Sequence, residues 1–233
     1  MILDADPFSD SPPQSPTDTV LPDYAPADAA SASRRPSGPP SGRPPSYMPP
    51  RRPAAPITYT FHSWSASLML LLPPAAGAGD RTPVANVAVA LNLNPFAPLA
   101  YVTTVRRGGQ SDGAPVGEFE IAVAHNRATV RIGNRWERIA NVLSQRRDTK
   151  HWRWRLNGIE FFWDCTKQLD DGSPMCLCLD GRGSQLASFV PPPIDASPPL
   201  PDATLTVFPD GHECFDHILI SALIVERKLT LSF

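Results

Sequence analysis

The sequence has little cysteine, no long apolar run and almost no net charge. Four cysteines among 233 residues are too few for a disulfide-stapled domain, so we expect reduced thiols, with Cys176 and Cys178 buried on one strand. The longest early apolar run, 68–72, ends before Pro73, whereas a membrane-spanning helix needs about 20 residues. A formal net charge of −2 provides no overall field for nucleic acid. We predict no transmembrane segment and no nucleic-acid partner.

Catalytic motifs are scarce as well. The sequence has no Gly-x-Ser-x-Gly elbow, phosphate loop or dinucleotide fingerprint. His212 and His217 are five residues apart, which on a helix turns the second imidazole about 140° from the first, so a regular helix cannot offer both to one zinc ion. Glu118 and Glu120 share a strand face and are typical of a solvated surface. We predict a non-enzymatic protein with no catalytic residue, no cofactor and no metal site.

The first 56 residues differ in composition from the rest of the chain. They hold 15 of the 29 prolines and eight serines but few large apolar side chains, so burial cannot offset the entropy of ordering this backbone. We predict a disordered Pro/Ser-rich tail over 1–56 and one domain over 57–233. The tail is either a solvated linker or an interaction arm, because its basic segments 39–45 and 49–53 resemble polyproline-II ligands.

The amino-terminal residues do not have the pattern of a secretory signal peptide. Asp4 and Asp6 stand where such a peptide carries basic residues, and no apolar stretch follows them. We therefore expect no signal peptide and an intracellular, cytoplasmic location.

From residue 57 onward, short apolar runs of period two alternate with Gly, Pro, Asn and Asp, which is typical of an all-β domain. The clearest element is a hairpin over 151–164 whose Asn157-Gly158 turn fixes the register. That register places Trp152, Trp154 and Leu156 on one apolar face, which favours core packing over an aromatic platform for single-stranded nucleic acid. The expected strands are 57–62, 67–72, 84–91, 101–106, 117–124, 128–133, 151–156, 159–164, 175–179, 186–190 and 203–208.

The segment 215–228 is apolar around almost its whole circumference. A helix with this pattern must be buried, since only Ser221 interrupts the apolar surface between positions 218 and 225. Its abundant isoleucine and valine leave a buried β-strand as the alternative.

Several motifs occur in a recognisable order, and together they resemble one family. They are Asn94-Pro95-Phe96, Arg106-Arg107-Gly108, Gly117-Glu118-Phe119-Glu120, Trp152-x-Trp154, Phe162-Trp163, and Phe215-Asp216-His217-Ile218 before Glu226-Arg227-Lys228. This order resembles the fungal domain-of-unknown-function family 6593, whose members are similar to the tubby and phospholipid-scramblase type of barrel. Over 57–233, the resemblance implies a closed antiparallel β-barrel of about 12 strands, whose lumen is wide enough to hold the hydrophobic C-terminal helix.

Basic side chains in the expected loops suggest a binding function. If two such loops meet at one rim, their guanidinium groups can bind an anionic head group, and the tubby resemblance implies a phosphoinositide-like lipid. Ordinary solvated loop charges are the alternative interpretation. Our first hypothesis is an interaction or scaffold module with a protein partner, and the second is a peripheral membrane module that binds anionic lipid. The candidate anion-binding residues are Arg106, Arg107, Arg146, Arg147 and Lys150, with Arg135 and Arg138 nearby.

Overall fold

The computed structural model describes residues 52–64, 67–75, 81–123, 127–146, 149–193 and 195–230. The chain divides into the units Met1–Tyr47 and Met48–Phe233, and every described residue belongs to the second. The predicted tail lies outside the described residues except for 52–56. In this short piece, Arg52 donates a hydrogen bond to Asp210 at 3.1 Å and pairs with Glu213. Contacts within the folded unit therefore begin before residue 57.

The alternating apolar segments form one antiparallel sheet, which has thirteen strands in the described part of the chain. Inward-facing side chains such as Phe61, Leu71 and Phe189 are fully buried, as the alternation predicts. In chain order the strands are β1 (Ile57–His62), β2 (Leu68–Leu72), β3 (Ala85–Asn92), β4 (Ala100–Arg107), β5 (Pro115–Ala122), β6 (Ala128–Ile132), β7 (Arg135–Arg138), β8 (Leu143–Gln145), β9 (His151–Leu156), β10 (Ile159–Gln168), β11 (Pro174–Leu179), β12 (Gln185–Val190) and β13 (Ala203–Val207).

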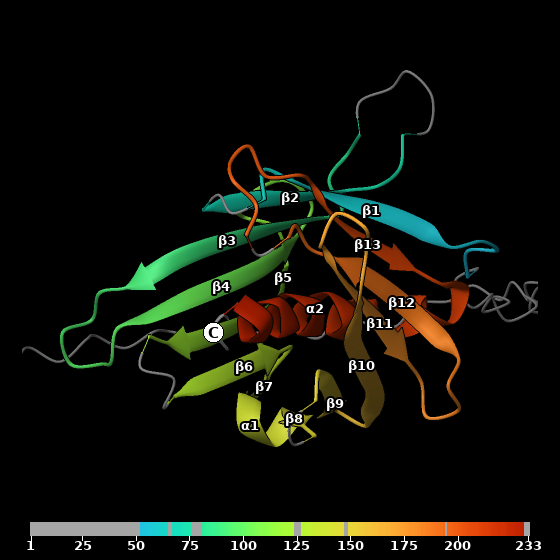
Figure 1. Cartoon of the computed structure of the whole chain (residues 1–233). Coiled ribbons are helices and arrows are strands. Elements are labelled where there is room, and N and C mark those ends of the chain that lie inside the picture. Colours follow the sequence, from blue (N-terminus) through green and yellow to red (C-terminus); the bar gives the residue numbers. More distant parts are fainter. Residues whose placement is uncertain are drawn as a thin grey trace, which may run out of the picture. The chain divides into compact units, whose positions relative to one another are not determined.

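The prediction of a closed barrel is wrong. The strands follow the order β7-β6-β5-β4-β3-β2-β1-β13-β12-β11-β10-β9-β8, and the end strands β7 and β8 do not pair with each other. Between them the chain forms one helical turn, α1 (Ile139–Val142), whose Ile139 and Val142 are buried. Strands of four and three residues beside this turn offer too few backbone partners to close the sheet. The sheet thus curls around a central helix but stays open along what we call the seam, between β7 and β8 (Figure 1).

The Asn-Gly hairpin between β9 and β10 has the predicted register. Asn157 and Gly158 adopt φ angles of 54° and 77°, as a type I′ turn requires. The inner face is buried, so the tryptophans pack in the core and do not form an exposed stacking platform. The inward pairs are Leu156 with Ile159, Trp154 with Phe161, and Trp152 with Trp163.

On the outer face of this hairpin, one ion pair does not follow the direct register. His151 lies opposite Asp164, and their side chains are 3.3 Å apart. Arg155 lies opposite Glu160, but the side chain that pairs with Glu160 is Arg153, at 2.7 Å. The register therefore predicts which residues face each other, while the reach of the arginine side chain decides the ion pair.

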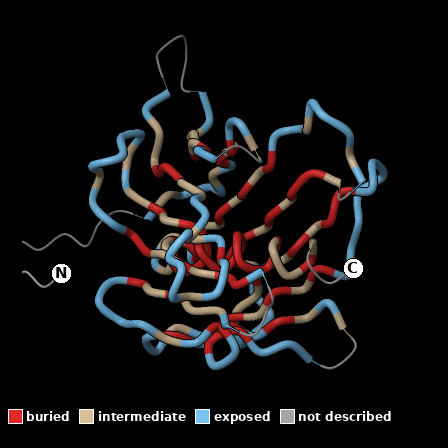
Figure 2. The backbone as a smooth tube through the Cα atoms, turned by 90° about the vertical axis from the view of Figure 1, so that its left-hand side faces the viewer, coloured by how far each residue is buried: buried red, intermediate tan, exposed pale blue. Residues whose placement is uncertain are grey.

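The apolar C-terminal segment forms a helix, α2 (Phe215–Thr230), which follows the 3-10 helix η1 (Pro209–Cys214). It runs inside the curved sheet (Figure 1), and the buried backbone positions concentrate around it (Figure 2). All positions from His217 to Glu226 are buried. Trp163 Nε1 donates a hydrogen bond to Ser221 Oγ at 2.9 Å, and this bond ties the helix to the sheet. Within the described residues, no helix combines the length and apolar content that crossing a membrane requires.

The expectation of reduced thiols is wrong for two of the four cysteines. Cys165 on β10 and Cys176 on β11 form a buried disulfide, with their Cα atoms 4.1 Å apart. Cys178 and Cys214 are free thiols. Cys178 is buried as expected, and this burial raises the pKa of its thiol well above the ordinary value. Adjacent antiparallel strands brought the first two cysteines together, a pairing that the count of cysteines did not reveal.

Candidate functional site

Two of the predicted basic residues lie at the end of β4, near the start of α2. Arg106 Nη1 donates a hydrogen bond to the carbonyl oxygen of Gly113 at 3.2 Å. Arg107 Nη2 pairs with the carboxylate of Asp216 at 2.8 Å, in the first turn of α2. Both guanidinium groups therefore already have partners within the protein.

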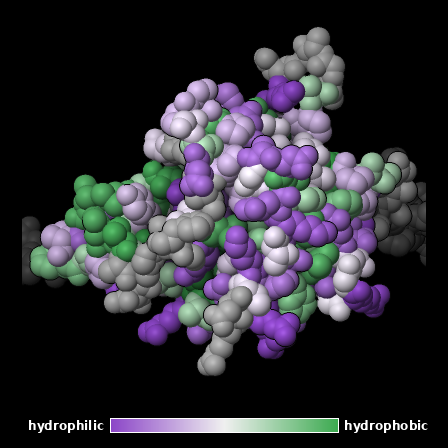
Figure 3. All heavy atoms as spheres, in the orientation of Figure 1, coloured by the Kyte–Doolittle hydropathy of each residue, from purple (hydrophilic) through white to green (hydrophobic). Residues whose placement is uncertain are grey.

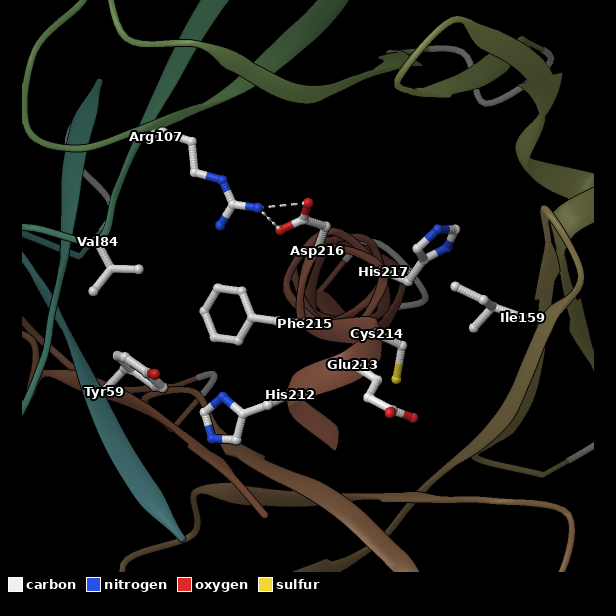
Figure 4. A pocket seen from close by; sticks show the side chains of 10 residues that line it. All are labelled: Tyr59, Val84, Arg107, Ile159, His212, Glu213, Cys214, Phe215, Asp216 and His217. Carbon is white, nitrogen blue, oxygen red and sulfur yellow. Dashed lines mark hydrogen bonds and ion pairs between the residues drawn. The ribbon is translucent and has the colours of Figure 1, made fainter. Parts of the chain in front are cut away.

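The pocket at the start of α2 has a volume of about 480 Å³. Its side chains come from strands on both sides of the helix and from the junction between η1 and α2, as Figure 4 shows. Arg107 and Asp216 face each other across one side of it, and Phe215 points toward Tyr59. The pocket is lined by Tyr59, Val84, Arg107, Ile159 and the run from His212 to His217.

The two histidines and the cysteine of this pocket are held in neutral forms. Burial lowers the pKa of His212 and of His217, and the nearby Asp216 offsets this only in part for His217. Burial raises the pKa of the Cys214 thiol to about 11. His217 Nδ1 accepts a hydrogen bond from Trp154 Nε1 at 3.2 Å, so this nitrogen is occupied by a structural bond. At neutral pH the pocket thus offers a protonated thiol and uncharged imidazoles.

The described part of the chain contains no group of three His, Cys, Asp or Glu side chains that could bind a metal ion. His212 lies in η1 and His217 in α2, on different helical elements. The two histidines that the sequence places five apart both line the pocket at the start of α2, together with Glu213 and Asp216. Asp216 is paired with Arg107 and Glu213 with Arg52.

The second group of predicted basic residues lies near the other end of α2. Arg146 and Lys150 are exposed in the β8–β9 connection, and Arg147 lies outside the described residues. Arg146 directly follows Gln145, which lines a larger pocket together with Lys228 from the last turns of α2. Arg107 and Arg146 thus lie near opposite ends of a helix of 16 residues, about 24 Å long. The structure does not bring the two predicted arginine loops to one rim.

The larger pocket lies at the seam, has a volume of about 770 Å³, and is called the seam pocket below. Three cationic side chains line it, Arg127 from just before β6, Arg138 from the end of β7 and Lys228 from α2. Its lining contains no aspartate or glutamate. The remaining side chains are Ala128, Thr129, Ile139, Ala140, Leu143, Ser144, Gln145 and Trp152.

A separate apolar surface projects beside the seam pocket. The connection between β3 and β4 carries Phe96, which is 97% exposed, and Leu93, which is 74% exposed. The backbone amide of Phe96 donates a hydrogen bond to Asn94 Oδ1 at 3.0 Å, so an Asx turn holds the ring outward. In Figure 3 this hairpin forms a hydrophobic patch at the left of the molecule. We call the patch the apolar tip; it consists of Leu91, Leu93, Phe96, Leu99, Tyr101 and Val123.

Backbone bonds join the apolar tip to the edge of the seam pocket. The amide of Val123 donates to the carbonyl oxygen of Leu99 at 2.9 Å, and the amide of Ala122 donates to the carbonyl oxygen of Arg127 at the same distance. Arg127 itself lines the seam pocket. Cationic and apolar side chains thus adjoin each other at the end of the sheet where α2 finishes.

Sequence reasoning identified neither the apolar tip nor the seam pocket as a site. A usable signal for the tip was present: Leu93, Phe96 and Leu99 fall between two expected strands, and the Asn94-Pro95 pair indicates a turn there. Apolar side chains inside a turn cannot follow the alternation of a strand into the core. No such signal exists for the seam pocket, because it depends on the two sheet edges failing to meet.

These features define a class of protein: an antiparallel sheet curled around a buried helix, with a cationic pocket and an exposed apolar hairpin at one end. The chain belongs to DUF6593, a family of unknown function, which matches residues 94–230. The match begins in the β3–β4 connection and ends with α2, so it is shorter than the 57–233 that the motifs implied. No curated protein and no solved structure matched the chain.

Proposed function

We propose that this protein is a non-enzymatic interaction module that docks on an anionic lipid surface through the apolar tip. The observation that carries the proposal is the near-complete exposure of Phe96 on a turn that holds it outward. Single exposed apolar residues are common on protein surfaces, but five on a projecting hairpin, with Val123 beside them, are typical of an interaction surface. A bilayer accepts a projecting apolar hairpin without needing a matching cavity, which favours lipid over a protein partner.

The energies support reversible attachment. Removing a phenylalanine or leucine side chain from water contributes about 1.5–3 kcal/mol, so Phe96 and Leu93 together contribute about 3–6 kcal/mol when both insert fully. Each arginine or lysine near an anionic leaflet adds about 1 kcal/mol. Arg127 adjoins the tip and is exposed, so it supplies such a charge. Apolar insertion combined with a cationic rim is the two-signal arrangement of peripheral membrane proteins.

The non-enzymatic part of the proposal is supported by the chemistry at the start of α2. A nucleophilic thiol must be a thiolate, whereas the pKa of Cys214 is raised to about 11. Cys214 Sγ also donates a hydrogen bond to the carbonyl oxygen of Gly211 at 3.5 Å, so it is not paired with an imidazole. The pocket therefore favours a structural role for these groups.

The location and the wider kinship belong to the same proposal. Anionic lipid is concentrated in the cytoplasmic leaflet of membranes, so we place the protein inside the cell, in the cytoplasm. We also propose a fungal origin and a relation to tubby and phospholipid-scramblase type proteins, which the motif order and the helix inside a curved antiparallel sheet support.

Vesicle cosedimentation of the full chain tests the proposal. We expect binding to vesicles of phosphatidylcholine that contain about 30% phosphatidylserine. Binding should be weaker to vesicles of phosphatidylcholine alone, and weaker at high salt. The double substitution Leu93→Ser/Phe96→Ser should reduce the partition coefficient at least tenfold. Trp136→Ser is the matched control, because Trp136 is 53% exposed but lies on β7, away from the tip.

Two results would refute this function. One is the absence of wild-type binding to anionic vesicles at low salt. The other is equal binding by the wild type, the Leu93→Ser/Phe96→Ser variant and the Trp136→Ser control. Either result would return the module to the broader hypothesis of a scaffold with a protein partner.

A further inference from the structure

We propose that the seam pocket is a binding site for a phosphate monoester that carries an apolar group. The site is separate from the apolar tip and does not depend on membrane docking. It exists because β7 and β8 remain unpaired and α1 spans the distance between them. Its volume of about 770 Å³ lies within the range of small-molecule sites, about 300–1,000 Å³.

The seam pocket is built on buried supports. Ile139 in α1 is 2% exposed and Trp152 on β9 is 4% exposed, so both side chains are anchored in the core, and both residues line the pocket. Leu143 on β8 adds a third apolar side chain and is 6% exposed. One wall of the pocket is therefore rigid and apolar, suited to a flat or aliphatic group.

The lining of the seam pocket also carries positive charge. Arg127 and Arg138 line the pocket, and within the described residues neither forms an ion pair with a carboxylate. Arg135, only three positions before Arg138, is paired with Glu137 at 3.1 Å, so that carboxylate is engaged elsewhere. Two exposed guanidinium groups at one pocket whose lining contains no carboxylate favour an anionic occupant.

Phosphate is the anion that fits this arrangement best. A phosphate monoester carries about −1.5 to −2 charges at neutral pH, and each guanidinium can bind two of its oxygens in a forked geometry. Lys228 adds a third positive charge, although its position in the last turns of α2 also places it near the negative end of the helix dipole. Thr129, Ser144 and Gln145 supply further hydrogen-bond donors at the pocket. A carboxylate would use fewer of these groups.

Isothermal titration calorimetry of the full chain with phenyl phosphate tests the site. We expect saturable binding that is at least tenfold tighter than binding of inorganic phosphate, because only the ester places a ring on the apolar wall. The double substitution Arg127→Ala/Arg138→Ala should weaken binding of phenyl phosphate at least thirtyfold. Both residues are exposed, so the fold should persist, and thermal melting of the variant verifies this.

Two further variants separate the possible causes of a loss. Arg81→Ala/Arg182→Ala removes the same charge from exposed positions that do not line the pocket, and its affinity should match the wild type. Leu93→Ser/Phe96→Ser should also bind phenyl phosphate like the wild type, since the apolar tip is not part of this site. Equal weakening in the Arg81/Arg182 variant would overturn the proposal, because it would reduce the effect to overall charge.

Vesicles distinguish a free phosphate monoester from a lipid head group. Binding to phosphatidic acid vesicles that exceeds binding to phosphatidylserine vesicles, and is lost in Arg127→Ala/Arg138→Ala, would support the seam pocket with a lipid as its ligand. Binding of phenyl phosphate alone would support it with a free ligand. If neither probe binds, or if binding is unchanged in this variant, the seam pocket is not a phosphate site.

Discussion

Replacing Ser221 by alanine tests whether hydrogen bonds hold the helix inside the sheet. Trp163 Nε1 donates to Ser221 Oγ at 2.9 Å, and both residues are fully buried. Without this acceptor the indole N–H remains buried and unpaired, which costs about 1–3 kcal/mol. Alanine favours the helix by about 0.5 kcal/mol over serine. The expected net loss in unfolding free energy is therefore about 0.5–2.5 kcal/mol.

The assay is equilibrium unfolding in urea, followed by circular dichroism, for a double-mutant cycle. Ser221→Ala and Trp163→Phe should each destabilise the protein, and the double variant should lose less than their sum by about 1 kcal/mol. Ser188→Ala on β12 is the control and should stay within about 0.5 kcal/mol of the wild type, because Ser188 is only partly buried. Zero coupling between Ser221 and Trp163 would refute the inferred bond between helix and sheet.

Two further predictions concern the same core. Burial lowers the pKa of His217 in the folded state, so the unfolded state takes up the proton first as the pH falls below the ordinary value of 6.5, and stability decreases toward low pH. His217→Asn keeps an acceptor for Trp154 but does not titrate, so urea unfolding at pH 7.5 and 5.5 should show a smaller decrease than in the wild type; an equal decrease would contradict this role. Gly117→Ala places a Cβ against Ile220 Cδ1 and the carbonyl oxygen of Arg131, and should cost about 1–3 kcal/mol in thermal unfolding. Gly181→Ala, where a Cβ meets open space, should change the stability by less than about 1 kcal/mol, and a similar loss in both variants would argue against close packing at Gly117.

The parts of the fold that depend on local chemistry could be predicted from the sequence. The Asn157-Gly158 turn determined the register of six residue pairs, because its positive φ angles suit few other residues and the turn length leaves no freedom. The apolar circumference of 215–228 determined the burial of α2, although the choice between helix and strand needed the structure. All eleven expected strands overlap strands of the sheet.

The parts that depend on long-range geometry could not be predicted. β7 has the sequence Arg-Trp-Glu-Arg, with no apolar alternation, and its Trp136 is more than half exposed. Closure requires the last strand edges to meet, and this depends on accumulated twist and on α1, neither of which leaves a periodic pattern. For the same reason the sequence grouped Arg107 with Arg146, while the structure assigns them to opposite ends of α2.

The position of α2 in the chain has a consequence for biosynthesis. The ribosome makes α2 after the thirteen strands of the described residues, so the concave face of the sheet has nothing to enclose until α2 emerges. β1 must also wait for its partner β13, since Thr58 and Thr206, whose hydroxyl groups are hydrogen-bonded, are 148 positions apart. A nascent chain that stalls before Phe215 should therefore remain sensitive to proteases and dependent on chaperones, and the native state should form slowly and only once α2 has been made.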